Sequence, residues 1–567
     1  MRFLVAVMRG LLGLLLPIGS VLAGATAPPD LPEAEKAIQN DVDHWGVAFA
    51  DQFRAFKNQF DTFEKKAGQG SLDYVLGVET SLRKTFPTKY WFKGQFANEV
   101  ELRAGRNESE AFQLAIMPKV GFELNDVQVN VSDFVKRGEG NASVTIPADA
   151  FKLWRVGFIE TKQPRYPTRY VGLWPDPLME LEPFSIGGVD LGLIWCEIKV
   201  PAEASPGDYR GTITVRASNS HELKLTVKLH VWDFVLPDRV PMPMLAWTRP
   251  LRDEQYYPYC ELLLSHHVDP IRMGFIKDPQ KRDEVLEFCF KRGLTYFECM
   301  RSKNEEKFKA YYEHIKSKGW LDKAIIYGGR DEPLKEQFEE IVVPYAEKLR
   351  KNFPGIQIFL ASQYYEGMKR GCDFLLLDVS TNFHSWLEAG RPGKQQLWWY
   401  FCNLPIQAEF ERPLSDAPLM VTDRDAIEHR VVYWMAHHYG VKGMFVYGGS
   451  LWPKGNENWP AEPFKVNESL PYPYGGIHNG NGFVIYPGPR PSIRLKNIRD
   501  GAEDYWYLTQ MAKLAQSGDY RQDAQALLDQ LRPTVFVDTH YFNRRPEVML
   551  DFRDRLGHFI EQASRSR

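Results

Sequence analysis

Short apolar runs and longer helical stretches alternate through the second half of this 567-residue chain. Runs of four or five apolar residues suit buried strands, and strands that alternate with helices predict a parallel sheet. About eight such units predict a (β/α)8 barrel, which we assign to residues 241–515. Nine candidate strands compete for eight places, so one of them is extra or misassigned. They are Met244 to Trp247, Ile271 to Phe275, Thr295 to Cys299, Ala324 to Tyr327, Ile356 to Leu360, Phe374 to Leu377, Leu397 to Phe401, Met444 to Tyr447 and Phe483 to Tyr486.

Helices are predicted between several of these strands, and more helices close the chain. Residues 516–567 form a predicted C-terminal helical segment that ends in a short polar tail. The predicted helices are Lys281 to Arg292, Glu305 to Lys318, Leu334 to Asn352, Asp425 to Tyr439, Ser492 to Leu508, Tyr520 to Leu531 and Glu547 to Ala563.

Residues 85–240 have a different pattern, in which apolar and polar residues alternate with a period of two. Short strands separated by turn-rich segments predict a β-sandwich for this region. Pro237, Pro241 and Pro243 break the pattern and mark a domain boundary near residue 240. The segment GLWPDPL at Gly172 to Leu178 is expected to separate strands. The predicted strands are Glu99 to Leu102, Ala111 to Met117, Val127 to Val131, Leu193 to Val200, Gly211 to Arg216 and Leu223 to Val231.

The N-terminal residues predict export. Within residues 1–27, Arg2 and Arg9 precede the apolar stretch Leu11 to Leu16, and small residues lead to Ala23 or Ala27, which is the layout of a cleaved signal peptide. We therefore expect a secreted or periplasmic protein without stable membrane insertion, since no later stretch has the roughly 20 apolar residues of a membrane span. Residues 28–84 are predicted as a helical segment, with an apolar stripe that we expect to be core: Trp45, Phe49, Phe53, Phe56 and Phe60.

The charge and cysteine content exclude several classes of partner. The 70 Lys and Arg nearly balance the 73 Asp and Glu, giving a formal net charge of −3, so neither nucleic acid nor an anionic membrane surface is an expected partner. A neutral partner such as a sugar fits better. The 6 cysteines form no CxxC pair and have no nearby His cluster, so we expect no metal site and no cofactor.

The motif YGGRDEP places two adjacent carboxylates where a predicted strand ends. Asp331 and Glu332 follow the apolar run Ala324 to Tyr327, which is the fourth strand candidate. Active sites of (β/α)8 barrels lie at the carboxyl ends of the strands, and paired carboxylates are typical of glycoside hydrolysis. The alternative is an acidic first turn of a solvated helix, with Pro333 in that turn and a helix over Leu334 to Glu340.

Several segments together resemble glycoside hydrolase family 123, from about residue 90 to 510. They are PDPL, PGDYRGTITV, YGGRDEP, LWWYFC, NGFVIYPG and PSIRLKNIRDGAEDYWYL. The resemblance implies a β-sandwich followed by a barrel, which agrees with the pattern above. It also implies β-N-acetylgalactosaminidase activity on a glycan or glycoconjugate, with the 2-acetamido group of the substrate as the nucleophile.

In that family the adjacent Asp and Glu carry the reaction, and they match Asp331 and Glu332. The implied roles are a general acid and base for Glu332, while Asp331 orients and stabilises the acetamido group. Adjacent carboxylates suit this division of labour, because an ordinary nucleophile and acid lie on opposite sides of the sugar. We expect burial and the neighbouring Asp331 charge to raise the pKa of Glu332.

A sugar also needs an aromatic floor and a pocket for the acetamido methyl group. Candidates lie at predicted strand ends, and for each of them a purely structural role is the alternative. Tyr327, Tyr400 and Trp452 lie closest to strand ends; the others are Trp247, Asn382, His384, Trp399 and Tyr447. Arg330 could act on either carboxylate or point outward.

Two features depart from the family pattern. Asn481 precedes Gly482 where relatives usually have an acidic residue, which leaves the choice between GalNAc and GlcNAc open. Residues 452–474 form a predicted long loop over the active face, which is either functional or a packing flap. Two other functions remain: a non-catalytic carbohydrate-binding or scaffold protein, and a glycosidase with two separated carboxylates that uses Glu298, Asp373 or Asp378 as the partner.

Overall fold

The computed structural model describes residues 31–565 apart from gaps at 44, 69–70, 138–142, 165, 250, 252–254, 301, 380, 391–396, 402–416, 457–458, 462 and 471–475. The predicted signal peptide lies outside the described residues. No helix among those described is long and apolar enough to cross a bilayer.

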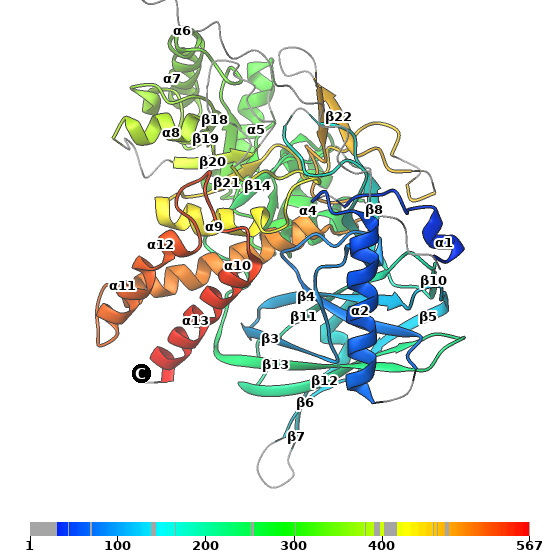
Figure 1. The fold of residues 1–567 in the computed structure, drawn as a ribbon. Helices are drawn as coiled ribbons and strands as arrows, with labels where there is room; N and C mark the ends of the chain where they lie inside the picture. The colour runs from blue at the N-terminus through cyan, green and yellow to red at the C-terminus, as the bar shows by residue number, and fades with distance from the viewer. Residues whose placement is uncertain are drawn as a thin grey trace, which may run out of the picture.

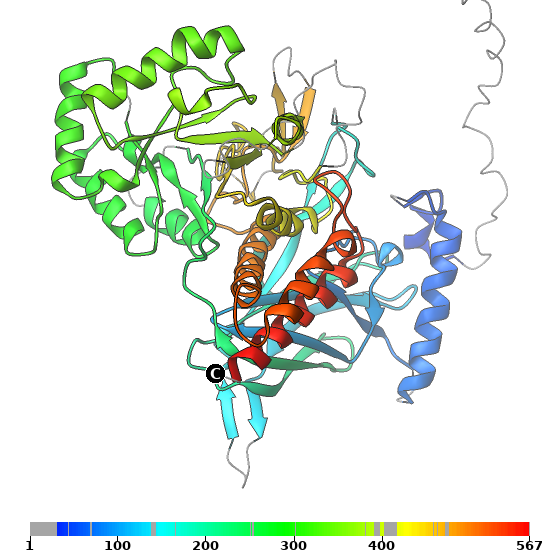
Figure 2. The ribbon, with the colours of Figure 1, turned by 90° about the vertical axis from the view of Figure 1, so that its left-hand side faces the viewer.

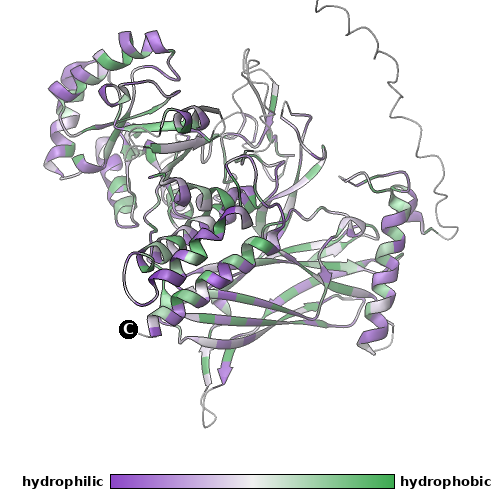
Figure 3. Cartoon of the chain, turned by 60° about the vertical axis from the view of Figure 1, so that its left-hand side comes forward, coloured by the Kyte–Doolittle hydropathy of each residue, from purple (hydrophilic) through white to green (hydrophobic). Residues whose placement is uncertain are grey.

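The N-terminal half is a β-sandwich, as predicted (Figure 1). Apolar side chains of two sheets meet in one core, and Figure 3 shows green and purple residues alternating along the strands. One sheet has the order β2-β1-β4-β11-β8-β9: Gln95–Phe96, Tyr74–Thr80, Ser109–Pro118, Gly192–Lys199, Phe151–Glu160 and Leu173–Glu180. The other has the order β10-β5-β12-β13-β3, with β6 paired to β12 and β7 paired to β6. These strands are Phe184–Ile186, Leu124–Val131, Gly207–Arg216, Leu223–Val235, Glu99–Arg106, Phe134–Arg137 and Ser143–Ile146.

Three expectations for this half were wrong. The predicted helical segment 28–84 contains β1, which pairs with β4 inside the sandwich, because Tyr74 and Leu76 belong to the core between the sheets. Helix α2 covers only Phe49–Ala67 and packs its Phe residues on the outer face of the first sheet, while Trp45 precedes it and is exposed. The segment GLWPDPL is not a separator but most of β9, where Trp174 and Leu178 are buried.

The second half is a parallel, barrel-like sheet of eight strands. Its order is β15-β14-β21-β20-β19-β18-β17-β16, so that the first and last strands in the chain pair and β15 and β16 stand at the two edges. Helices surround it in the upper part of Figure 1. The strands in chain order are β14 Met244–Ala246, β15 Val268–Pro270, β16 Phe297–Glu298, β17 Ala324–Tyr327, β18 Gln357–Ala361, β19 Phe374–Asp378, β20 Leu397–Phe401 and β21 Met444–Val446.

Two of the nine strand candidates were wrong. Residues Ile271–Phe275 form a 3-10 helix, η5, because the chain pairs with β14 through the three preceding residues and then bends over β16. The second strand is therefore β15. Phe483 to Tyr486 is the extra candidate: Phe483 and Tyr486 make only isolated bridges, and their rings pack with Phe464. The predicted 452–474 loop contains β22 Asn467–Leu470, which pairs with β23 Gly476–Asn479.

The helices of this half begin with α3 and end with α13. Figure 2 shows the last of them, in red, running back along the sandwich. They are α3 Tyr256–Leu264, α4 Pro279–Phe290, α5 Glu305–Ser317, α6 Lys335–Gln337, η7 Phe338–Val342, α7 Val343–Asn352, α8 Thr381–Glu388, α9 Glu428–Tyr439, α10 Ile493–Leu514, α11 Arg521–Asp529, α12 Leu531–Thr534 and α13 Pro546–Arg565.

Buried ion pairs join the two halves. Arg430 on α9 contacts Asp504 on α10 at 2.6 Å and Glu110 on β4 at 3.3 Å. Arg553 on α13 contacts Glu110 at 3.0 Å and Glu108 at 2.5 Å. Buried charges are stable only when they are paired, so these contacts fix how the barrel sits on the sandwich.

Candidate active site

The two adjacent carboxylates lie in a bend at the carboxyl end of β17. Gly328 leaves the strand while still donating its N–H to Phe359 O at 2.9 Å, and a Cβ there would lie 2.9 Å from Leu360. Asp331 and Glu332 are exposed, and Glu332 has a left-handed φ of 40°. Helix α6 begins only at Lys335, so neither carboxylate is in its first turn. The reading of this pair as a helix start is therefore wrong.

Tyr327 holds the first carboxylate. Its hydroxyl donates a hydrogen bond to Asp331 Oδ1 at 2.5 Å and accepts one from the Ala361 N–H at 3.3 Å. Burial and the Asp331 charge raise the pKa of Tyr327 well above its usual value, so the phenol keeps its proton. A residue at the end of β17 thus orients a carboxylate four positions further along the chain.

Tyr400 holds the second carboxylate from another strand. Its hydroxyl donates to Glu332 Oε1 at 2.8 Å. Side chains alternate along β20, so the neighbouring Trp399 points away from the site and packs its ring on Phe383 at 5.0 Å and Tyr439 at 6.1 Å. Trp399 is a core residue and does not belong to the site.

An aromatic wall lies beside Tyr327. The half-buried Trp247 ring is 5.6 Å from Tyr327, 5.1 Å from Phe445 and 6.1 Å from Tyr447, each edge to face. Tyr327 ends β17. The other residues lie in or just after β14 and β21, the first and last strands of the barrel, and these two strands are neighbours in the sheet. The wall can form one side of a sugar pocket.

Three other sequence candidates are not joined to this group by the contacts of the described residues. Trp452 packs its ring on Tyr259 at 6.0 Å and lies under Arg249. His384 contacts His540 Nδ1 at 2.9 Å and Thr539 Oγ1 at 3.0 Å, both in the segment before α13. Asn382 lies in α8, and its side chain is outside the described part of the chain.

Sequence reasoning missed Arg272 and gave Glu298 only as an alternative partner. The guanidinium carbon of Arg272 lies 4.1 Å from the centroid of the Trp247 ring, and its Nε lies 3.7 Å from Glu298 Oε2. The signal was present in part, because both residues stand at the carboxyl ends of strands that are consecutive in the chain, β15 and β16. It was obscured because Arg272 was placed inside a strand.

The separated-carboxylate alternative gains little support. Asp373 accepts a hydrogen bond from the Ile358 N–H at 2.8 Å, beside the beginning of β18 and so at the opposite end of the sheet. Glu298 is buried and faces Arg272, and Asp378 is buried at the end of β19. Neither of these two is exposed as Asp331 and Glu332 are.

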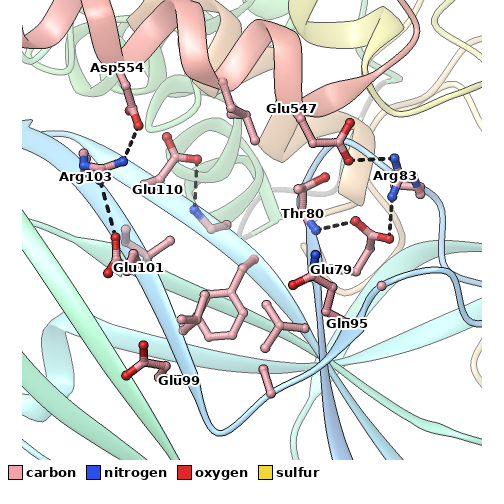
Figure 4. Close-up of a pocket in the computed structure, with 18 of the residues that line it drawn as sticks. Glu79, Thr80, Arg83, Gln95, Glu99, Glu101, Arg103, Glu110, Glu547 and Asp554 are labelled. Carbon is pink, nitrogen blue, oxygen red and sulfur yellow. Dashed lines mark hydrogen bonds and ion pairs between the residues drawn. The ribbon is translucent and has the colours of Figure 1, made fainter. Parts of the chain in front are cut away.

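A cleft of about 410 Å³ lies elsewhere, between the sandwich and α13 (Figure 4). Arginines pair with several of its carboxylates: Arg83 bonds Glu79 and Glu547, each at 2.9 Å, and Arg103 bonds Asp554 at 2.5 Å. Such compensated pairs fasten the C-terminal helix to the sandwich. The cleft therefore lies along an internal interface between α13 and the sandwich.

A parallel barrel that carries two exposed carboxylates at the end of its fourth strand has the fold and the acidic groups that barrel glycosidases use. The glycoside hydrolase 123 catalytic domain matches residues 293–511, and the glycoside hydrolase 123 N-terminal domain matches residues 87–217. The chain belongs to glycoside hydrolase family 123 and is a glycoside hydrolase.

A solved structure from the same family agrees on the fold. A family 123 glycoside hydrolase from Clostridium perfringens, described for glycolipid glycan hydrolysis, is 14% identical with a TM-score of 0.61 and covers 87% of this chain and 99% of its own. A family 39 glycoside hydrolase from Bacteroides cellulosilyticus is 11% identical with a TM-score of 0.32, covering 67% of this chain and 82% of its own. No curated protein sequence matches the chain.

Proposed function

We propose that this protein is a retaining β-N-acetylgalactosaminidase in which the 2-acetamido group of the substrate is the nucleophile. One observation carries the proposal: Asp331 and Glu332 are adjacent, and each accepts a hydrogen bond from its own tyrosine. Two carboxylates in one bend cannot flank a sugar ring as a separate nucleophile and acid would. They can serve the acetamido group and the leaving group, which lie on neighbouring carbons.

The proposed reaction has two steps. Glu332 gives its proton to the glycosidic oxygen as the C1–O bond breaks, and the acetamido carbonyl oxygen forms a new bond to C1. Asp331 accepts a hydrogen bond from the acetamido N–H and stabilises the positive charge of the oxazolinium that results. Water then attacks C1, gives a proton to Glu332 and releases the acetamido oxygen. Two inversions at C1 give net retention, and both carboxylates return to their starting states.

The tyrosines support this division of roles. Tyr327 donates to Oδ1 of Asp331, which assigns Oδ2 to the acetamido N–H. Tyr400 donates to Oε1 of Glu332, which assigns Oε2 to the transferred proton. Trp247 and Tyr447 form the aromatic side of the sugar pocket.

The preference for GalNAc comes from family membership and from the resemblance of the site motif. Hydrolysis of aryl β-GalNAc, β-GlcNAc and β-galactoside side by side tests it. We expect activity only on 2-acetamido sugars, with GalNAc the better substrate. Equal cleavage of the galactoside would remove the participating group from the mechanism, and no turnover on any of the three would favour a binding protein.

A second measurement tests the nucleophile. Successive fluorination of the acetamido methyl group withdraws electrons from the carbonyl oxygen, so the rate should fall steeply with each fluorine if that oxygen attacks C1. Asp331→Asn and Glu332→Gln should each lose activity, while the matched control Glu336→Gln, an exposed acid in α6, should keep it. A rate that is insensitive to fluorination would contradict substrate participation.

We also propose export, on the layout of residues 1–27. Expression of the full chain in a bacterial host with fractionation tests it. The mature protein should appear outside the cytoplasm and begin near Ala23 or Ala27.

A further inference from the structure

We infer that Arg272 is a positioning residue for the Asp331 carboxylate, acting through the rings of Trp247 and Tyr327. The inference rests on the proposed function, in which Asp331 must hold the acetamido group. It concerns a residue that lies outside the Asp-Glu motif, on another strand end.

Arg272 belongs to η5, which follows β15 directly at the carboxyl end of the sheet. Its guanidinium covers the Trp247 ring, with Cζ 4.1 Å from the ring centroid. A planar guanidinium so close to an aromatic face is held by cation–π attraction and stacking. One face of the Trp247 ring is therefore covered by Arg272, which restrains the tilt of the ring.

The carboxylate of Glu298 and the packing of η5 on β16 restrain Arg272 itself. Glu298 at the end of β16 is 3% exposed, and its Oε2 lies 3.7 Å from Arg272 Nε. Two residues further along, Gly274 lies so close to β16 that a Cβ would stand 2.0 Å from Glu298 O. The turn that carries Arg272 is thus packed directly on the strand that carries its partner carboxylate.

Trp247 in turn restrains Tyr327, which is hydrogen-bonded to Asp331. Its ring meets Tyr327 at 5.6 Å and 66°, and the Tyr327 hydroxyl donates to Asp331 Oδ1 at 2.5 Å. Side chains in contact cannot tilt independently in a close-packed interior. If the Arg272 plane is removed, Trp247 gains room to rotate, Tyr327 follows, and Asp331 loses its fixed direction.

The consequence for the reaction is a loss of orientation. The acetamido oxygen has to meet C1 in a near-attack geometry, and an error of about 1 Å in such a site costs about 100-fold in rate. Binding of the sugar depends on the whole pocket and is affected less. Arg272 should therefore influence kcat more than KM.

The test uses Arg272→Gln, Glu298→Gln and the double variant in the full chain with nitrophenyl β-GalNAc. We expect kcat to fall about tenfold to 100-fold in Arg272→Gln, with KM within about twofold of wild type. Because Glu298 acts through Arg272, the double variant should be no slower than Arg272→Gln alone. Arg272→Lys, which keeps the charge without the plane, should also be slow.

Arg292→Gln is the matched control. Its guanidinium carbon lies 3.6 Å from the Phe288 ring and it pairs with Glu261, but it follows the end of α4, away from the carboxyl ends of the strands. It should keep wild-type kcat and KM. Thermal unfolding of each variant identifies any that are misfolded.

Three results would overturn the inference while leaving the proposed function in place. They are a wild-type kcat in Arg272→Lys, additive losses in the double variant, or a raised KM with unchanged kcat, which would make Arg272 a direct substrate contact. By contrast, a wild-type protein that does not cleave the 2-acetamido substrate contradicts the proposed function itself.

Discussion

The hydroxyl of Tyr400 donates a hydrogen bond to Glu332 Oε1 at 2.8 Å across 68 residues of sequence. The two residues come from β20 and from the bend after β17, and β18 and β19 lie between these strands in the sheet. The barrel thus brings the hydroxyl of Tyr400, which lies three strands away in the sheet, to Glu332, the proposed acid. Its hydrogen bond fixes the direction of a carboxylate that is otherwise exposed.

Tyr400→Phe should slow substrates with poor leaving groups. Without the hydroxyl, Glu332 loses the hydrogen bond that orients it, and proton transfer to the leaving oxygen becomes less well aligned. We expect kcat/KM to fall about tenfold or more on an alkyl or sugar aglycone and much less on an activated nitrophenyl glycoside, where protonation contributes little.

The neighbouring residue is the control for that experiment. Trp399→Phe alters the outer face of β20, where the ring packs on Phe383 and Tyr439. It should lower the free energy of unfolding without changing the ratio of rates on the two substrates. An equal loss of rate on both leaving groups in Tyr400→Phe would contradict its assignment to the acid.

Tyr327→Phe should give the opposite pattern. Asp331 loses the donor on Oδ1, so the acetamido group is held poorly whichever leaving group departs. We expect kcat to fall about tenfold to 100-fold on both activated and poor leaving groups. Steady-state kinetics with a nitrophenyl and an alkyl β-GalNAc measure this, and a loss confined to the alkyl substrate would exclude the role.

Much of this site could be predicted from the sequence. The strands before both tyrosines have the predicted bounds, because Ala324–Tyr327 and Leu397–Phe401 are unbroken apolar runs with no competing turn residues. A strand that ends at Tyr327 places Asp331 and Glu332 at the carboxyl face without further information.

The sequence does not show which partners the fold brings together. Period two predicts that Trp399 and Tyr400 point to opposite sides, but not which side is the interior. The side chain of His384 is hydrogen-bonded to His540, which lies 156 residues further along the chain. Arg272 was placed in a strand because IRMGF is apolar, whereas pairing with β14 uses the three residues before it. Such long-range contacts override local propensity.

Arg430→Met should destabilise the protein strongly. Arg430 is 1% exposed and faces Asp504 at 2.6 Å and Glu110 at 3.3 Å, so its loss leaves buried carboxylates with less compensation. Breaking a buried pair on one side costs about 3–5 kcal/mol, and we expect a change of that size in the free energy of unfolding from urea denaturation.

Arg54→Met on α2 is the control for Arg430→Met. Arg54 also forms an ion pair, with Asp51 at 2.5 Å, but both side chains are more than half exposed. Its removal should cost less than about 1 kcal/mol. Similar effects of the two substitutions would show that the buried network does not hold the barrel on the sandwich.

Asp423 should make stability fall as pH rises through the mildly acidic range. Burial raises the pKa of this carboxyl to about 6, against the lowering effect of hydrogen bonds from Tyr166 at 2.5 Å and Asn479 at 2.7 Å. The unfolded chain releases the same proton near pH 3.8. The folded state therefore holds more protons between these values, and its stability is fully present below about pH 4 and is lost up to about pH 6.

Asp423→Asn isolates this effect, because the amide does not titrate. The free energy of unfolding of wild type minus that of the variant should fall by roughly 3 kcal/mol between pH about 4 and about 6 and then stay level. The variant's own packing cost shifts the whole difference curve and leaves its slope unchanged. Tyr166→Phe removes a donor that lowers the pKa of Asp423, so it should move the falling part of the wild-type curve to higher pH. A difference that is flat or rises over this range would show that Asp423 is ionised in the folded protein already at low pH.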